Sequence, residues 1–364
     1  MSDNRLKIGI TQGDTGGIGW EVILKSLCDP TICELCTPVV YGSRQASDLY
    51  TSRIALEEAV RFNFCHSAAE ARFGMLNLVE CGTKEARIEI GKASTEGAKA
   101  AIAALEAASR DLASGDLDAV VTAPINKEAM QGAGFEFTGH TEYFGAKAEG
   151  EPMMIMCSEL LRVALATVHI PVEKVAESLS KDGLVAQLHA LRKTLKQDFG
   201  VVEPRIAVLS LNPHAGDGGL LGKQEEEIIR PAILEAYEAG TLAFGPLSAD
   251  GLFASGGYKK YDAILAMYHD QGLTPFKTLS PEGVNFTAGL SVVRTSPDHG
   301  VAYDIAGKDK ADAQSMRNAI YDAIDIVRRR RAYERWSRNP LEHFEREKGK
   351  DISVKDLKLP EQGE

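Results

Sequence analysis

Short apolar, β-branched runs alternate along the chain with longer amphipathic stretches. Between these runs, residues 94–115 begin at Ser and Thr, carry an alanine-rich apolar face and end at glycine, which predicts one helix. Strands that alternate with helices predict βαβ units and a mainly parallel sheet. Six runs have the length and composition of buried strands: 7–10, 38–42, 118–124, 162–169, 205–214 and 262–270.

The length of 364 residues exceeds what one compact core usually accommodates, so two α/β lobes with a cleft between them are expected. We find no repeat of fixed period and no Gly/Ser-rich or Pro-rich linker. The chain is therefore expected to pass between the lobes more than once.

The formal net charge of −11 disfavours nonspecific binding to nucleic acid or to an anionic membrane. No apolar run approaches the roughly 20 residues that cross a bilayer, and a cytoplasmic enzyme is the expectation. The arginine run at 328–331 lies in a helical pattern with interspersed acids, which favours a solvated helix face over a polyanion site. An anionic substrate would need a local cationic pocket.

Six cysteines are too few for a disulfide framework in a chain of this size. Cys33 and Cys36 form a CxxC, with Cys28 nearby, but no second pair or histidine completes a zinc site. Reduced core residues are favoured over a redox or metal site.

Polar, reactive residues follow four of the predicted strands. In open α/β sheets ligands bind beyond the carboxyl ends of the strands, where loops converge and helix N-termini present free N–H groups. The positions concerned are Thr122 to Lys127, His169, Asn212 to His214, and His269 with Asp270. These segments are the predicted walls of an active site.

Three of the strand-end residues are histidines: His169, His214 and His269. Three converging imidazoles hold a divalent cation and leave coordination positions for substrate. A single strand-end histidine is more often an ordinary hydrogen-bonded residue. The spacings of 45 and 55 residues bring the three together only if the strands are neighbours or a second subunit contributes.

Groups suited to a phosphate lie near these histidines. A lysine supplies a point charge, an arginine a planar fork, and hydroxyl or amide groups complete the oxygen shell. An anionic substrate is therefore predicted. The residues are His140, Thr141, Lys277, Asn285 and Arg294, followed by the DHG sequence at 298–300.

Two glycine-rich segments, 13–19 and 216–222, depart from the GxGxxG pattern, so neither is a Rossmann fingerprint. No GxxxxGK[ST] sequence occurs, which excludes a P-loop. Each segment fits an anion-holding turn and an ordinary strand-to-helix turn equally well.

Together these segments resemble the signature blocks of the 4-hydroxythreonine-4-phosphate dehydrogenase family. The resemblance runs from about Met1 to Ala332, with the blocks in the family's order. Thr15 and Trp20 stand where the family usually has proline, and Pro297 replaces a smaller or aliphatic residue. The blocks lie at 13–21, 122–130, 139–146, 211–219, 266–277 and 284–312.

The resemblance implies a two-lobed α/β fold similar to isocitrate and isopropylmalate dehydrogenases, with mainly parallel sheets and a non-Rossmann nucleotide site. It implies a homodimer whose active site is shared across the interface, and NAD or NADP as cofactor with binding residues that we do not assign. The expected first lobe comprises 1–127 and 300–340. The second lobe, 128–299, should carry most metal and substrate residues and the dimer contacts, and 341–364 is a charged extension.

The resemblance also assigns roles to residues. His169, His214 and His269 match metal ligands drawn from both subunits, for one divalent ion per subunit: zinc first, with magnesium, cobalt or manganese as alternatives. Asp250 and Asp270 match carboxylates near the metal and are the expected catalytic residues. The substrate-binding positions are His140, Thr141, Lys277, Asn285 and Arg294.

The implied reaction is oxidation of 4-(phosphooxy)-L-threonine, a small phosphorylated hydroxy amino acid, to 2-amino-3-oxo-4-(phosphooxy)butanoate. This product decarboxylates to 3-amino-2-oxopropyl phosphate in pyridoxal 5'-phosphate biosynthesis. Two alternatives stay open: a related 4-phosphoerythronate or 4-phosphothreonate dehydrogenase, and a three-histidine metal hydrolase of a phosphorylated metabolite.

Overall fold

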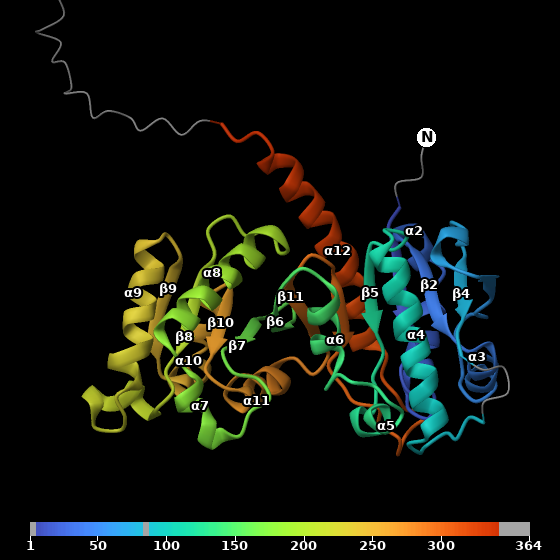
Figure 1. Ribbon diagram of the computed structural model, residues 1–364, viewed down its shortest axis with the longest axis horizontal. Helices are drawn as coiled ribbons and strands as arrows, with labels where there is room; N and C mark the ends of the chain where they lie inside the picture. The colour runs from blue at the N-terminus through green and yellow to red at the C-terminus, as the bar shows by residue number, and fades with distance from the viewer. Residues whose placement is uncertain (1–4, 83–86, 342–364) are drawn as a thin grey trace, which may run out of the picture.

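The computed structural model describes residues 5–82 and 87–341. Within them one sheet of 12 strands runs through the molecule in the order β3-β4-β2-β1-β5-β12-β11-β6-β7-β10-β8-β9 (Figure 1). The strands are β1 Lys7–Thr11, β2 Thr37–Gly42, β3 Phe62–Cys65, β4 Leu76–Glu80, β5 Ala119–Thr122, β6 Gly150–Cys157, β7 Arg162–Leu165, β8 Arg205–Leu209, β9 Leu242–Leu247, β10 Ala263–Ala266, β11 Val284–Leu290 and β12 Arg294–Pro297.

The sheet consists of two parallel blocks joined by antiparallel strands. The first block is β3, β4, β2, β1, β5 and β12, and the second is β7, β10, β8 and β9. Between the blocks, β11 pairs antiparallel with both β12 and β6, and β6 pairs antiparallel with β7. The predicted α/β class with a mainly parallel sheet is confirmed, and one continuous sheet serves both halves. The lobe boundaries stay a prediction.

The helices are α1 Gly19–Leu27, α2 Ile32–Leu35, α3 Arg44–Thr51, α4 Thr95–Ala113, α5 Lys127–Gly132, α6 His140–Lys147, α7 Val172–Ser178, α8 Lys181–Gln197, α9 Arg230–Glu238, α10 Ala249–Ala254, α11 His269–Leu279 and α12 Gln314–Ser337. Short η segments span Ala68–Glu70 (η1), Pro213–Gly219 (η2), Glu225–Ile229 (η3) and Gly257–Lys260 (η4). Polar side chains at Ser43, Ser94, Asn126 and Ser180 accept a backbone N–H three residues on, which satisfies a free donor at the starts of α3, α4, α5 and α8. None of the helices in the described ranges is long and apolar enough to span a membrane.

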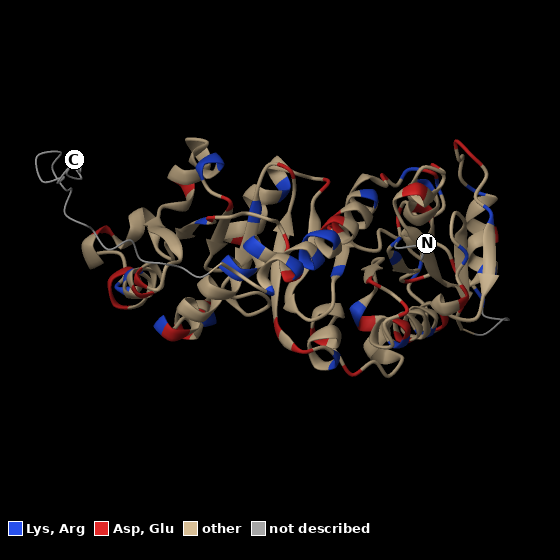
Figure 2. Ribbon diagram, turned by 90° about the horizontal axis from the view of Figure 1, so that it is seen from above, with Lys and Arg blue, Asp and Glu red and all other residues tan. Residues whose placement is uncertain are grey.

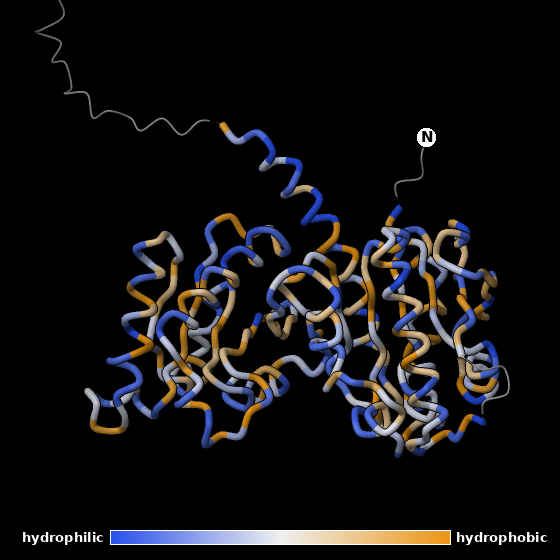
Figure 3. The backbone as a smooth tube through the Cα atoms, in the orientation of Figure 1, coloured by the Kyte–Doolittle hydropathy of each residue, from blue (hydrophilic) through white to orange (hydrophobic). Residues whose placement is uncertain are grey.

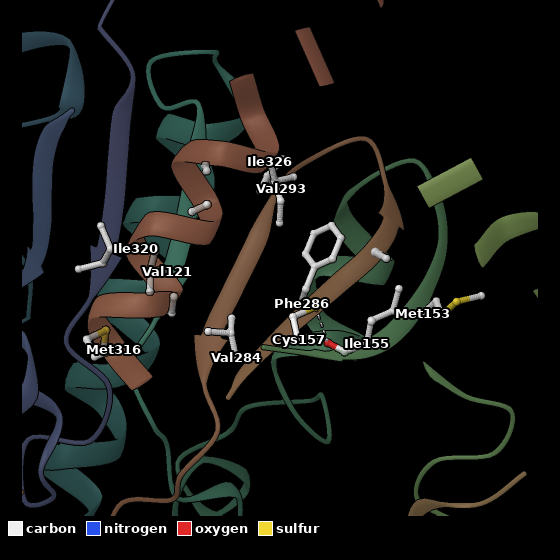
Figure 4. Close-up of a cluster of buried hydrophobic side chains, with 14 of the residues drawn as sticks. Val121, Met153, Ile155, Cys157, Val284, Phe286, Val293, Met316, Ile320 and Ile326 are labelled. Atoms are coloured by element: carbon white, nitrogen blue, oxygen red, sulfur yellow. Dashed lines mark hydrogen bonds between the residues drawn. The ribbon is translucent and has the colours of Figure 1, made fainter. Parts of the chain in front are cut away.

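The core lies where α12 crosses the middle of the sheet. Apolar side chains of α12 belong to one buried cluster with those of β5, β11 and β6 and with Val293, which precedes β12 (Figure 4). Figure 3 shows the strands as predominantly apolar and the outer half of α12 as hydrophilic. Arg330 on α12 forms a buried ion pair with Asp198, which follows α8, at 2.9 Å from Nε to Oδ1. Helix α12 therefore joins segments from both halves of the chain.

Helices α5, α7 and α11 follow the carboxyl ends of β5, β7 and β10, respectively. All three helices lie along the lower edge of the molecule in Figure 1. Strand ends from both blocks therefore face one region, which is where the candidate site residues are found.

Candidate active site

Arg294, the first residue of β12, is a buried cation whose hydrogen-bond partners are neutral groups. Its Nε and Nη2 donate to Thr122 Oγ1 at 3.0 and 2.6 Å, and its Nη1 donates to Thr287 Oγ1 at 3.0 Å. Burial lowers the pKa of Arg294 to about 9, and the charge of Glu142 acts in the opposite direction. Among the described residues, this guanidinium forms hydrogen bonds with hydroxyls and an imidazole, so its charge favours an incoming anion.

His140 begins α6 and adjoins this guanidinium. Its Nδ1 lies 3.2 Å from Arg294 Nη2. Burial lowers the pKa of His140 well below its ordinary value, and the charges of Arg294 and Lys127 act in the same direction. The ring is therefore neutral, and because Nδ1 faces a permanent donor, Nε2 bears the proton. Thr141 follows in the first turn of α6.

His169 and His269 lie side by side, with ring centroids 5.9 Å apart. His169 follows β7, and His269 begins α11 after β10. His269 Nδ1 forms a hydrogen bond with Asp270 Oδ1 at 2.7 Å, which fixes the ring and leaves Nε2 for a ligand. Burial lowers the pKa of His169, and the charge of Lys127 adds to this effect. A neutral imidazole is the form that binds a metal ion.

His214 is held in a separate loop. It lies in η2, where residues 214–218 all have positive φ, beginning with 50° at His214 and 53° at Ala215. Buried Glu225 fixes the start of this loop, because its Oε1 accepts the N–H groups of Leu211 and Asn212 at 2.8 and 2.7 Å. The loop presents an exposed His214.

Asp250, in the first turn of α10, lies near enough to His214 for the charge of His214 to affect its pKa. The Ser248 hydroxyl, which donates to Asp250 Oδ1, lowers the pKa of Asp250 most. The Gly251 N–H also lowers it, and the charge of His214 adds a smaller contribution. The two predicted catalytic carboxylates therefore lie near different histidines: Asp250 near His214, and Asp270 beside His269.

The structure brings two of the three predicted metal ligands together. Within a single chain, the described residues contain no group of three or more His, Cys, Asp or Glu side chains that could hold a metal ion. Convergence of all three histidines inside one chain is not observed, and their convergence across two subunits stays a prediction.

A second cationic group lies on α11, the helix that begins with His269. Lys277 on α11 forms an ion pair with Asp298 at 2.8 Å. Burial raises the pKa of Asp298, whereas the hydrogen bond from Lys277 lowers it. Among the described residues, buried polar atoms without a hydrogen-bond partner include Asn285 Oδ1, Asp298 Oδ2 and His299 Nε2. Such atoms are expected where a bound molecule completes the hydrogen bonding.

Several residues of this region are absent from the sequence-based assignment. Lys127 and Glu142 lie close together near Gly139, where an added Cβ would be 3.1 Å from Glu142 Oε2 and 3.8 Å from Lys127 Nζ. Both side chains influence the pKa of His169. The sequence pointed to Lys127, because this residue ends the run of reactive residues that follows β5. It did not point to Glu142, because a glutamate in the first turn of a helix is common.

The first glycine-rich segment is a buried packing turn. Gly13 has φ of 67°, and a Cβ there would meet the Pro124 carbonyl oxygen at 2.3 Å. Trp20 is fully buried and donates from its indole nitrogen to Gln12 Oε1 at 2.9 Å. The Tyr303 hydroxyl donates to Asp14 Oδ2 at 2.6 Å. The turn therefore ties β1 and β5 to the segment before α12, and Trp20 fills core space.

The cysteines in the described structure are free thiols. Burial raises the pKa of Cys33, and it raises that of Cys36 to about 12. Cys36, Cys81 and Cys157 are buried, as expected for core residues, whereas Cys28, Cys33 and Cys65 are only partly buried.

Comparisons with known proteins agree with this arrangement. The sequence profile of the family described as "Pyridoxal phosphate biosynthetic protein PdxA" matches residues 34–323. A 4-hydroxythreonine-4-phosphate dehydrogenase from Bacteroides thetaiotaomicron is 50% identical over 344 residues, covering 94% of each chain. The chain belongs to the PdxA family. The predicted family resemblance is confirmed.

Solved PdxA-family structures have the same fold. The crystal structure of 4-hydroxythreonine-4-phosphate dehydrogenase from Klebsiella pneumoniae has a TM-score of 0.78 and 32% identity, covering 90% of this chain and 99% of the other. A putative D-threonate 4-phosphate dehydrogenase from Cutibacterium acnes is 38% identical over 327 residues, covering 88% of this chain and 94% of that protein. The chain is an oxidoreductase, so the hydrolase alternative is not retained.

Proposed function

We propose that the chain catalyses the metal-dependent, NAD(P)-linked oxidation of 4-(phosphooxy)-L-threonine to 2-amino-3-oxo-4-(phosphooxy)butanoate. This β-keto acid then decarboxylates to 3-amino-2-oxopropyl phosphate, a step of pyridoxal 5'-phosphate biosynthesis. The main supporting observation is the adjacent histidine pair, His169 and His269, together with buried Arg294 and the Lys277–Asp298 pair. The names of the family's enzymes provide the substrate.

The cationic groups of the site would bind the substrate phosphate. Arg294 is already oriented by two threonine hydroxyls, so little side-chain entropy is lost when an anion binds. His140 donates from Nε2, and Lys277 adds a mobile point charge, since half of its side chain is exposed. Asn285, with a free buried Oδ1, and Thr141 are proposed to hold the amino acid end of the substrate.

The donor set fits a divalent metal ion. His169 and His269 are adjacent, and the carboxylate of Asp270 orients the second ring. We propose that His214 of a partner subunit completes the site in a homodimer. When bound, a divalent ion, with zinc first and magnesium, cobalt or manganese as alternatives, would supply Lewis acidity to the substrate hydroxyl.

Each predicted catalytic carboxylate acts through its histidine. Asp270 accepts the Nδ1 hydrogen of His269 and so keeps the lone pair of Nε2 directed outward. Asp250 is held by Ser248 and Gly251 near His214. We therefore assign both aspartates as positioning residues for the metal-binding rings. NAD or NADP would accept the hydride.

A substrate panel tests this function. The purified enzyme is supplied with zinc and NAD or NADP, and reduced nicotinamide is measured with 4-(phosphooxy)-L-threonine, D-threonate 4-phosphate and 4-phosphoerythronate. The proposal predicts the highest kcat/KM for 4-(phosphooxy)-L-threonine. A higher kcat/KM for D-threonate 4-phosphate would instead support the activity named for the Cutibacterium acnes relative.

A further inference from the structure

A hollow of about 330 Å³ lies between the outer half of α12 and the beginning of the described chain. Four arginines line it: Arg328, Arg331 and Arg335 from α12, and Arg5 from the segment before β1. Glu34 is the acidic residue in the lining. None of these residues belongs to the candidate active site.

The three α12 arginines share one face of the helix, because spacings of three and four residues return to the same side. Figure 2, seen from the side toward which α12 projects, shows Lys and Arg gathered along this helix. The sequence analysis favoured a solvated face for 328–331, and this expectation is wrong for Arg330, which is 8% exposed.

Contacts with the protein hold three of the four guanidinium groups around the hollow. Arg328 Nη2 donates to the Leu35 carbonyl oxygen at 3.0 Å. Arg331 Nη2 pairs with Asp118. The Arg5 guanidinium lies over the Phe73 ring, 3.3 Å from its centroid. Their positions are therefore partly fixed before any ligand binds, which reduces the entropy lost on binding.

The charge of the hollow is opposite to that of the whole protein. Even with Glu34 and Asp118 counted against them, the three α12 arginines alone leave a net positive charge, whereas the chain has a net charge of −11. Guanidinium forks match phosphate oxygens in pairs. An anion with several negative charges gains more from several guanidinium groups than a singly charged anion does, so such a ligand fits best.

We propose that this arginine hollow is a binding site for a small molecule that carries linked phosphate groups. Its volume is at the lower end of the range for small-molecule sites, about 300–1,000 Å³, which suits a diphosphate group rather than a large ligand.

Calorimetric titration of the full-length enzyme with inorganic pyrophosphate tests the proposal. Arg335→Gln removes a charge that lines the hollow, and Arg338→Gln removes an equal charge three residues further along, outside the lining. We expect saturable binding of one pyrophosphate per chain. Arg335→Gln should weaken it about tenfold, since a charged hydrogen bond is lost, whereas Arg338→Gln should leave it within about twofold.

Arg328→Gln serves as a second lining variant, and Lys277→Gln controls for binding at the active site. The proposal requires weakening by Arg328→Gln and unchanged binding to Lys277→Gln. Equal weakening by Arg335→Gln and Arg338→Gln would show that the positive charge of α12 attracts pyrophosphate nonspecifically. That result would overturn the proposal. Loss of binding with Lys277→Gln alone, or the absence of saturable binding, would overturn it too.

Discussion

Lys277 and Arg294 have the residue types expected for phosphate recognition, but their surroundings differ. Arg294 is 3% exposed and bonded to hydroxyls, whereas the Lys277 side chain is half exposed and pairs with Asp298. Arg294 is therefore part of the folded core, while Lys277 can be changed with little effect on folding. This difference makes Lys277 the better probe of substrate binding.

Lys277→Gln should raise KM for the phosphorylated substrate about tenfold or more, because a charge-assisted hydrogen bond contributes ~1.5–3 kcal/mol. The effect on kcat should be smaller, since phosphate binding is remote from the reacting carbon. Steady-state kinetics measure both constants. Lys259→Gln, at an exposed lysine of η4, is the control, and an unchanged KM in Lys277→Gln would contradict the assignment.

Asp322 on α12 gives a pH-dependent prediction. Burial raises its pKa to about 6, and the charge of Asp325 adds to the effect. The pKa of an unfolded aspartate is ~3.9, so the folded state favours the protonated form and stability falls as pH rises from about 4 to about 6. The destabilisation is complete above about pH 6.

Asp322→Asn should therefore raise the free energy of unfolding at neutral pH by about 1–2 kcal/mol, allowing for solvent screening of a half-buried group, and change it little near pH 4. Urea denaturation at the two pH values measures the difference. A gain of the same size at both values would show that the charge of Asp322 is not its cause.

Sequence reasoning located the reactive residues but not all of their neighbours. It identified His169 and His269 because each follows an apolar strand, and the structure places them together. It missed Glu142 because an acidic residue in the first turn of a helix is a common feature. It missed Thr287 because a threonine is an ordinary residue inside a strand.

Among the elements, η2 is the most unusual, because six successive residues, 214–219, adopt positive φ. Gly216 and Gly218 both lie in it, but their surroundings differ. A Cβ at Gly216 would meet Glu225 Oε2 at 2.8 Å, whereas nothing lies within 4 Å of a Cβ at Gly218. The two glycines therefore separate backbone strain from steric crowding.

Gly218→Ala should destabilise the protein by about 1 kcal/mol through backbone strain alone. Gly216→Ala should cost roughly 2–4 kcal/mol, because it also displaces the carboxylate that holds the loop. Gly216→Ala should further weaken zinc binding, since His214 adjoins this glycine in the loop. Chemical denaturation and zinc titration of both variants measure the effects, and equal losses would contradict the role of Glu225.

The secondary structure was predicted correctly where the composition is strongly biased, toward β-branched residues in strands or toward alanine in a helix. All six predicted runs contain a strand of the parallel blocks, and the predicted helix 94–115 corresponds to α4. The strands that join the blocks were not predicted. Of these, β6 reads GEPMMIMC, with one β-branched residue, and neighbouring β12 of the first block, also not predicted, reads RTSP, with an arginine and a proline. Tertiary pairing, rather than local preference, makes these segments strands.

Helix α12 connects the two halves of the chain. Arg330 bonds both carboxylate oxygens of Asp198 and donates to the carbonyl oxygens of Leu290 and Ser291. Burial raises the pKa of Asp198, whereas the bonds from Arg330 lower it. Removing the arginine would leave a buried, unpaired carboxylate.

Arg330→Met should lower the free energy of unfolding by about 3–5 kcal/mol, the cost of an unpaired buried charge. Arg329→Met is a matched control, because the neighbouring arginine is exposed and pairs with Asp325, and it should cost less than about 1 kcal/mol. Thermal and urea denaturation provide the comparison. Similar losses in both variants would contradict the proposed role of Arg330.

The proposed metal site needs two chains: His169 and His269 come from one, and His214 from its partner. Mixing inactive His214→Ala and His269→Ala chains by refolding tests it most directly, with zinc-dependent nicotinamide reduction as the measurement. In a mixed dimer one site keeps all three imidazoles, so the mixture should regain about a quarter of wild-type activity with random pairing. A mixture that stays as inactive as each variant alone would contradict a shared site.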